Sequence, residues 1–324
     1  MPLIIDSDPP LHTRIRKPLT RSFTPRRIAD MQPRIAAVAS ELLDGFASDG
    51  QGDIVERFAW PLPLIIVGEM ISVPCDDLHR LHEWSKDWLA LFQAVPSVEQ
   101  HVAHAEGYVE LQRYFVDRIE ERAHRPTDDL MSALIAANSE EDEPLTPEEL
   151  AGIPLDLIVA GHVTVTRAIG NALVLLLEDR GQMASMLADA GTLENGIEEI
   201  LRLESPAQGL FRETTREVEL GGVVIPEGAR VMAHFGSANR DEDVFEDAAR
   251  FDVRRDDVGR HIAFGKGIHF CIGAPLARLE LRTALPMLFD RLPRLRLDDS
   301  HELEYETVFF ARGLARLFVV WDPA

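Results

Sequence analysis

The strongest constraint on the fold of this chain is residues 147–178, whose pattern predicts one long helix. Thr146 is a candidate N-cap, Pro147 suits the first helical turn, and Glu149 completes a capping box. A helix of this length spans roughly 48 Å, enough to cross a small domain. Because the stretch is apolar nearly all round, we expect it to be buried. We expect Pro154, which has no amide donor, to kink or restart the helix.

The rest of the chain predicts a mainly α fold with a minor antiparallel β region. Apolar residues recur at three- and four-residue spacing in 33–47, 77–92 and 105–123, as in amphipathic helices. Residues 139–147 read as an acidic loop, and helical spacing returns at 275–292. From about residue 212, alternation around Gly-Gly and Pro-Glu-Gly turns predicts short antiparallel strands, and 308–321 predicts a second hairpin. No repeat or flexible linker divides residues 1–324, so we expect a single domain.

Composition narrows the class of protein. The formal net charge is −22, which argues against binding to nucleic acid or to anionic lipid. The two cysteines, Cys75 and Cys271, cannot build a disulfide framework and suit a reducing compartment. No signal peptide is evident at the start, and no apolar run reaches the length of about 18 residues typical of a transmembrane helix. We therefore expect a cytoplasmic protein that does not bind a membrane.

Cys271 lies in an unusual loop, FGKGIHFCIG, at residues 264–273. Gly265, Gly267 and Gly273 indicate a tight turn or a close approach, and a helix is predicted to begin just after the loop. A helix N-terminus stabilises a thiolate, which serves as a nucleophile, a redox centre or a metal ligand. His269 is a candidate base for a nucleophile, whereas a structural metal site would need more soft ligands. A lone thiolate suits haem better, because the porphyrin supplies four donors. An inert buried cysteine is the remaining alternative.

The loop resembles the haem-binding signature of the cytochrome P450 family. The matching residues are Phe264, Gly267, His269, Cys271 and Gly273.

Three further segments match the same family in the correct order. Glu199 and Arg202 have the spacing of its buried Glu-x-x-Arg pair, and Arg250 falls where the third member of that group lies. Residues 160–164, AGHVT, match the oxygen-binding motif of the central helix, and residues 8–27 resemble the C-helix region of bacterial members.

The resemblance implies a cytochrome P450-like fold with a b-type haem whose iron is bound by the thiolate of Cys271. Amides that follow this cysteine would donate hydrogen bonds to the sulfur. Phe264 would pack beside the porphyrin, and Gly265 and Gly273 would belong to the haem-binding loop. The implied partners of the haem propionates are His12, Arg16, Arg212 and His261.

On the opposite side of the haem, the resemblance assigns Ala160 and Gly161 to a groove in the long helix. It assigns to the hydroxyl of Thr164 a part in delivering protons to bound oxygen. The family usually carries an acid just before this threonine, whereas this chain has Val163. His162 points in a direction that differs from Val163 by about 100° along a helix. A water chain, a substrate group or another side chain is therefore expected to carry the protons.

These features predict a bacterial-type monooxygenase that inserts one oxygen atom from O2 into a small or medium apolar organic molecule. The resemblance places residues 207–211 and 308–310 along the substrate space. No strand–glycine–helix unit for NAD or flavin surrounds the GxG pattern near Gly265, so the electron donors are expected to be a ferredoxin and its reductase. Arg260 and Lys266 are candidate contacts for an acidic ferredoxin.

Two alternatives follow from departures from the family pattern. Val163 favours a haem-thiolate enzyme activated by peroxide or by a substrate group. The chain begins close to the first motif, so we expect it to lack the family's N-terminal strands and first helices. That expectation favours a more open pocket with weaker haem retention, or an inactive haem-binding fragment.

Two histidine pairs stand outside this scheme. His79 with His82 and His101 with His104 have a spacing that can hold a metal on a helix, but no third ligand is evident. Solvent-facing histidines are the preferred interpretation.

Overall fold

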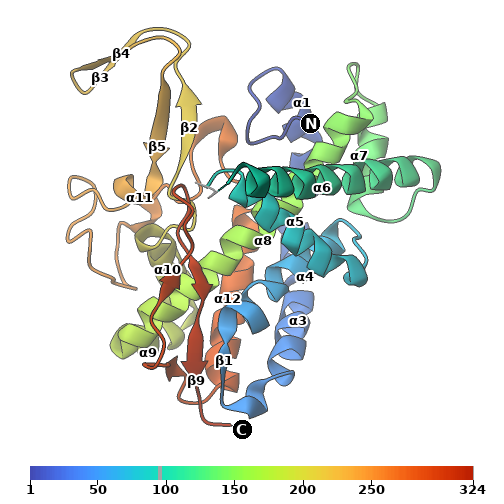
Figure 1. Cartoon of the computed structure of the whole chain (residues 1–324). Coiled ribbons are helices and arrows are strands. Elements are labelled where there is room, and N and C mark those ends of the chain that lie inside the picture. The colour runs from blue at the N-terminus through green and yellow to red at the C-terminus, as the bar shows by residue number, and fades with distance from the viewer. Residues whose placement is uncertain (94–96, 324) are drawn as a thin grey trace.

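The computed structural model describes residues 1–93 and 97–323, and its architecture is mainly helical (Figure 1). The α-helices are α1 (Leu11–Ser22), α2 (Pro25–Ala29), α3 (Gln32–Asp44), α4 (Pro61–Met70), α5 (Leu78–Ala90), α6 (Val98–His124), α7 (Leu130–Ser139), α8 (Pro147–Glu178), α9 (Arg180–Leu187), α10 (Ala190–Leu203), α11 (Phe235–Ala238) and α12 (Ala274–Arg291). Short turns of 3-10 helix lie at Ala47–Asp49, Cys75–Asp77, Val258–Arg260 and Gly267–His269, and a π-helical turn lies at Val55–Ala59.

The predicted long helix is confirmed as α8, with the predicted bounds. The hydroxyl of Thr146 accepts the amide hydrogen of Glu149, and the Glu149 carboxylate accepts that of Thr146 at 2.9 Å. This reciprocal pair is the predicted capping box. Pro154 lies inside the helix, which continues through it, so the helix does not restart there.

Helix α8 joins the two hydrophobic cores of the molecule and crosses its centre in Figure 1. Its residues between 150 and 159 pack in one core with α1, α4 and α6. Its residues between 165 and 177 pack in the other core with α3, α10 and α12. The segment that carries the motif of residues 160–164 therefore lies where the two cores meet.

The strands form small antiparallel sheets. They are β1 (Gln51–Asp53), β2 (Gly209–Glu213), β3 (Val218–Leu220), β4 (Val223–Ile225), β5 (Arg230–His234), β6 (Arg296–Leu297), β7 (Glu304–Tyr305), β8 (Leu314–Arg316) and β9 (Phe318–Val320). β2 pairs with β5, and β3 pairs with β4 in a hairpin that projects from the body in Figure 1. These pairs confirm the β region predicted after residue 212.

The predicted second hairpin at residues 308–321 is wrong. β8 pairs with β7, whereas β9 pairs with both β1 and β6. Leu317 alone separates β8 from β9. One residue is too short a loop for a hairpin, so the chain passes from one sheet to another instead.

α8 is also the one helix in the described part of the chain that is long and apolar enough to span a membrane. In its most apolar window, 78% of the residues are buried inside the protein.

Candidate haem site

The loop before α12 is shaped by two glycines in a left-handed conformation. Gly265 and Gly267 both have φ of 70°, which residues with a side chain adopt at a cost. The amide of Cys271 donates to the carbonyl oxygen of Phe264 at 2.9 Å, which closes the loop on itself. Helix α12 then begins at Ala274, so the loop presents Cys271 just before a helix N-terminus, as predicted.

The sulfur of Cys271 is surrounded by hydrogen-bond donors. The amides of Gly273 and Ala274 both donate to it, which confirms the prediction that amides following the cysteine bind the sulfur. A Cβ on Gly273 would lie 3.9 Å from the sulfur, so the backbone passes close to it. Burial raises the pKa of the Cys271 thiol, whereas the two amides and the nearby Arg16 and Arg278 lower it. The residue nevertheless has accessible surface, so it is open to a ligand.

Three of the predicted propionate partners gather around this loop. His12 is 3% exposed, and its Nε2 has no hydrogen-bond partner. Its ring lies 4.5 Å from the ring of His269, measured between centroids. Arg16 donates to the carbonyl oxygen of Phe270 at 2.6 Å. Arg212 is exposed and lies close enough to lower the pKa of His269, after burial and His12.

His261 is arranged differently. Its Nε2 lies 2.9 Å from a carboxylate oxygen of Glu198, and its Nδ1 accepts the amide hydrogen of Ala263. Both ring nitrogens therefore have protein partners, and a propionate contact from His261 stays a prediction. Phe264 lies partly buried beneath the guanidinium of Arg278, which is 4.4 Å from the centre of its ring.

The residues of α8 that the sequence assigns to the site are accessible. Ala160 is exposed, and Gly161 and Thr164 are partly exposed, on a helix that is otherwise mostly buried. The hydroxyl of Thr164 donates to the carbonyl oxygen of Ala160 at 2.8 Å. A Cβ on Gly161 would lie 3.2 Å from Val67 of α4, so a larger residue would crowd the helices at this point.

Two segments predicted to line the substrate space lie side by side. Ala207 bridges to Ala311, and the amide of Gln208 donates to the carbonyl oxygen of Phe310 at 2.7 Å. The side-chain amide of Gln208 donates to Ser205, so this one polar side chain is held by the backbone.

The family model "Cytochrome P450" matches residues 84–303. The 6-deoxyerythronolide B hydroxylase of Saccharopolyspora erythraea is 40% identical over 319 residues, which is 98% of this chain and 77% of that protein. Cytochrome P450 107B1 of the same organism is 39% identical over 98% of this chain and 76% of its own length. The chain belongs to the cytochrome P450 family.

Solved structures agree with this assignment and confirm the predicted P450-like fold. P450BioI, in complex with an acyl carrier protein ligated to hexadec-9Z-enoic acid, superposes with a TM-score of 0.92 at 31% identity. That match covers 99% of this chain and 82% of the other. CYP109E1 of Bacillus megaterium, in complex with testosterone, gives a TM-score of 0.89 at 35% identity and covers 99% and 86% of the two chains. Membership of the P450 family implies a haem cofactor and monooxygenase activity.

The residues around Cys271 fit a haem. A single thiol with two amide donors suits an iron whose other equatorial donors belong to a porphyrin. The described residues contain no group of three or more His, Cys, Asp or Glu side chains that could hold a metal ion by themselves. The partnerless Nε2 of buried His12, with Arg16 and Arg212 nearby, suits a group that carries two carboxylates.

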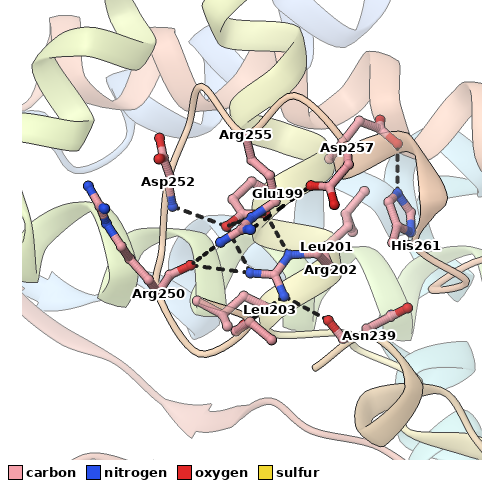
Figure 2. A network of polar contacts seen from close by, with 12 residues as sticks. Glu199, Leu201, Arg202, Leu203, Asn239, Arg250, Asp252, Arg255, Asp257 and His261 are labelled. Atoms are coloured by element: carbon pink, nitrogen blue, oxygen red, sulfur yellow. Dashed lines mark hydrogen bonds and ion pairs between the residues drawn. The ribbon is translucent and has the colours of Figure 1, made fainter. Parts of the chain in front are cut away.

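The buried Glu-x-x-Arg pair of the P450 is present, but the predicted third member is wrong. Glu199 and Arg202 are fully buried and joined by two bonds of 2.6 and 2.9 Å. Arg255, not Arg250, is the second arginine on Glu199, at 3.1 and 3.2 Å from its two oxygens. Figure 2 shows the Arg250 guanidinium pointing away, with its carbonyl oxygen turned toward the other two arginines. The sequence offered no signal for this choice, because residues 250–255 belong to no regular element.

The interpretation of the two histidine pairs as solvent-facing holds for His79 and His101, which are exposed, and is wrong for His82 and His104, which are partly buried against other residues. His82 meets His162 of α8, with 3.4 Å between their nitrogens, and His104 meets Asp87 at 2.9 Å. His79 is exposed and lies edge-on to Trp60.

Asp156, one turn before Ala160 on α8, is a buried acid that the sequence analysis did not single out. One of its oxygens accepts the amide hydrogen of Ile4 at 2.5 Å. Burial raises its pKa to about 7, and the nearby carboxylate of Asp6 adds to the shift. Tyr108 of α6 lies close enough to interact with both carboxylates.

We expect Asp156→Asn to raise the melting temperature more at pH 8 than at pH 5. A pKa raised on folding means that the folded state favours the protonated acid, so stability is lost as pH rises from about 4 through 7. Asparagine keeps an oxygen for the Ile4 amide and does not ionise. Thermal melts at both pH values test this, with exposed Asp142→Asn as the control. We expect the gain to differ by about 5 °C between the two pH values. An equal gain at both would contradict the prediction.

Proposed function

We propose that this P450 is a cytoplasmic haem b-thiolate monooxygenase that inserts one oxygen atom from O2 into a small or medium apolar organic molecule. The observation that carries the proposal is the sulfur of Cys271, held between two amides beside a helix start and surrounded by cationic groups. The relatives support the reaction type, since their names include a hydroxylase and the mycinamicin IV hydroxylase/epoxidase of Micromonospora griseorubida. Location in the cytoplasm is supported by likeness to bacterial relatives.

When bound, the haem would supply the redox chemistry that activates dioxygen, and a thiolate ligand favours cleavage of the O–O bond. Cys271 would be the ligand, and the amides of Gly273 and Ala274 would tune the electron density on its sulfur. His12, Arg16 and Arg212 would hold the propionates.

Thr164 would handle protons at the accessible face of α8. Its hydroxyl already donates to the carbonyl oxygen of Ala160, and rotation about its side-chain bond would let it donate elsewhere. Val163 is 9% exposed and carries no proton, and His162 is turned into the protein. A water chain or a group on the substrate is therefore the proposed proton source.

The proposed substrate space has an aromatic wall. Ring contacts run from Phe211 to Phe309 at 5.7 Å, on to Phe310 at 5.4 Å, and then to Phe92 at 5.6 Å. Phe309 is 56% exposed and Phe92 is 41% exposed, although both are large apolar residues. Aromatic side chains in an open position favour binding of an apolar molecule.

The proposed electron donors are a ferredoxin and its reductase. Lys266 and Arg260 are both exposed near the Cys271 loop. In a chain with an excess of acidic residues, these cations are candidate contacts for an acidic ferredoxin.

Turnover with Thr164→Val tests the role of the hydroxyl. A panel of apolar compounds is first screened by the spectral shift on binding, and a compound that binds is then incubated with NADPH, ferredoxin and reductase. We expect the variant to form roughly tenfold less product per NADPH consumed than the wild type, because a positioned proton donor is lost. Thr215→Val is the control, since this threonine is exposed and lies outside α8.

Two results would count against this scheme. Equal coupling in the wild type and Thr164→Val would remove the threonine from proton delivery. Product formed with hydrogen peroxide, but none with the electron-transfer proteins, would favour the peroxide-driven alternative.

A further inference from the structure

The side of α8 that faces away from the site carries a histidine with both nitrogens engaged. His162 is 1% exposed, and its Nδ1 lies 2.5 Å from the carbonyl oxygen of Ile158. A carbonyl only accepts, so Nδ1 of His162 bears the proton and its Nε2 has a free lone pair. That lone pair faces Nδ1 of His82 on α5, 3.4 Å away. The direction of donation is therefore fixed, from His82 to His162 to Ile158.

Both rings are neutral in this arrangement. Burial is the main cause that lowers the pKa of His162 to about 4 and that of His82 to about 3. The pair therefore makes an uncharged connection between α5 and α8 at neutral pH.

A tryptophan and a close helix contact hold the pair in place. The ring of His82 stacks on Trp60, with 4.1 Å between centroids and 11° between planes. Trp60 in turn donates to Glu56 at 3.3 Å. Beside His162, Gly161 allows Val67 of α4 to pack closely against α8. Contacts from α4 and α5 therefore both hold the turn of α8 that contains Gly161 and His162.

The turn held in this way is the one that carries Thr164. The carbonyl oxygens of Ile158, Ala160 and His162 each accept a side-chain hydrogen bond from four residues later. Such bonds compete with the backbone ladder and bend a helix locally. His162 takes part at both ends, because its ring binds Ile158 and its carbonyl oxygen binds the hydroxyl of Thr166. Its direction differs from that of Thr164 by about 200°, so it does not enter the site.

We propose that His82 and His162 are positioning residues, which tie α5 to residues 158–164 of α8 and thereby set the orientation of the Thr164 hydroxyl. The inference rests on the proposed function, because it gives Thr164 a part in the oxygen chemistry. It accounts for a partly buried polar pair between two helices. Apolar side chains of the same shape could fill the same space without leaving an unpaired polar group, so packing alone does not explain the pair.

Two substitutions of His82 separate the hydrogen bond from the packing. His82→Phe keeps a ring against Trp60 and removes the donor to His162. His82→Asn restores a donor, because its amide nitrogen lies near the position of the histidine Nδ1. His79→Phe is the control, since this exposed residue lies on the same helix and makes no contact with His162 among the described interactions.

We expect His82→Phe to speed amide hydrogen exchange in residues 158–166 by about fivefold, the change expected from losing one hydrogen bond. Product formed per NADPH should fall several-fold, while the dissociation constant of the bound compound stays within about twofold of the wild type. His82→Asn and His79→Phe should behave as the wild type in both measurements. The carbon monoxide difference spectrum confirms in each variant that the haem is bound.

Unchanged exchange in His82→Phe overturns the proposal, whatever the activity. A second result also overturns the proposal: amide hydrogen exchange is faster in His82→Phe, but product formed per NADPH is unchanged, while Thr164→Val lowers product per NADPH in the same assay. In that case the proposed function still stands. If the wild type itself forms no product, the proposed function fails and the positioning role falls with it. The wild-type protein offers a test without substitution, namely the nitrogen-15 spectrum of its imidazoles in the reduced carbon monoxide form. A proton on Nε2 of His162 contradicts the proposal.

Discussion

Cys271→Ala should abolish the strongly red-shifted Soret band that the reduced protein gives with carbon monoxide. That band is the signature of haem iron bound by a thiolate, and an alanine offers the iron no ligand. The loop places two hydrogen-bond donors on this sulfur, since the amides of Gly273 and Ala274 both donate to it. The measurement is the difference spectrum of purified, dithionite-reduced protein, with and without carbon monoxide.

Cys75→Ala is the matched control, because it removes the other cysteine of the chain. Cys75 is exposed, begins a short helical turn and has no haem-binding residue near it in the sequence. We expect this variant to keep the red-shifted band in full. A red-shifted band that survives in Cys271→Ala would refute the assignment of the ligand. A wild-type band at the position typical of histidine ligation would do so as well.

We do not expect His269 to replace the lost sulfur, because its ring packs against that of His12. A neutral imidazole would also lack the negative charge by which a thiolate favours O–O cleavage. We therefore expect Cys271→Ala to lose monooxygenase activity even where some haem stays bound.

The parts of the structure that the sequence predicted well are those that neighbouring residues determine. The start of α8 follows from Thr146, Pro147 and Glu149, which satisfy the first free amides of the helix within one turn. The loop before α12 is similar, because Gly265 and Gly267 adopt left-handed conformations that other residues disfavour. In both places the pattern and its physical cause lie within about ten residues.

The parts that the sequence did not predict depend on contacts between distant segments. The pairing of His82 with His162 joins residues 80 positions apart, and each histidine alone reads as an ordinary helical residue. Asp156 interrupts an apolar stretch, but its partner Ile4 lies 152 residues earlier. The wrong prediction of Arg250 in place of Arg255 has the same origin. The fold of an irregular segment decides which of the two guanidinium groups reaches Glu199.

Arg255→Leu should destabilise the protein strongly, whereas Arg250→Leu should be close to neutral. Arg255 donates to both oxygens of Glu199 and to the carbonyl oxygens of Glu246, Asp247 and Arg250. A leucine would leave these buried acceptors with fewer donors, and breaking a buried ion pair costs about 3–5 kcal/mol. The side chain of Arg250 is exposed, so its loss should change the free energy of unfolding by less than about 0.5 kcal/mol.

The measurement is the melting temperature of each variant, together with the fraction of purified protein that retains haem. Arg255→Lys should recover only part of the stability, because an ammonium group cannot reach several separated oxygens as a planar guanidinium does. Equal destabilisation by Arg255→Leu and Arg250→Leu would contradict the placing of Arg255, rather than Arg250, against Glu199.

Haem retention should fall together with stability in Arg255→Leu, because the buried group of Glu199, Arg202 and Arg255 is connected to the cysteine loop. Arg202 donates to the carbonyl oxygen of Asn239 at 2.7 Å, and the side chain of Asn239 accepts the amide hydrogen of Ile262 at 2.7 Å. Ile262 lies two residues before Phe264, where the loop begins. Without Arg255, Glu199 and Arg202 lose a neighbour that holds the segment between Asn239 and the loop. Loosening this segment should therefore loosen the thiolate ligand, although no residue of the group touches it.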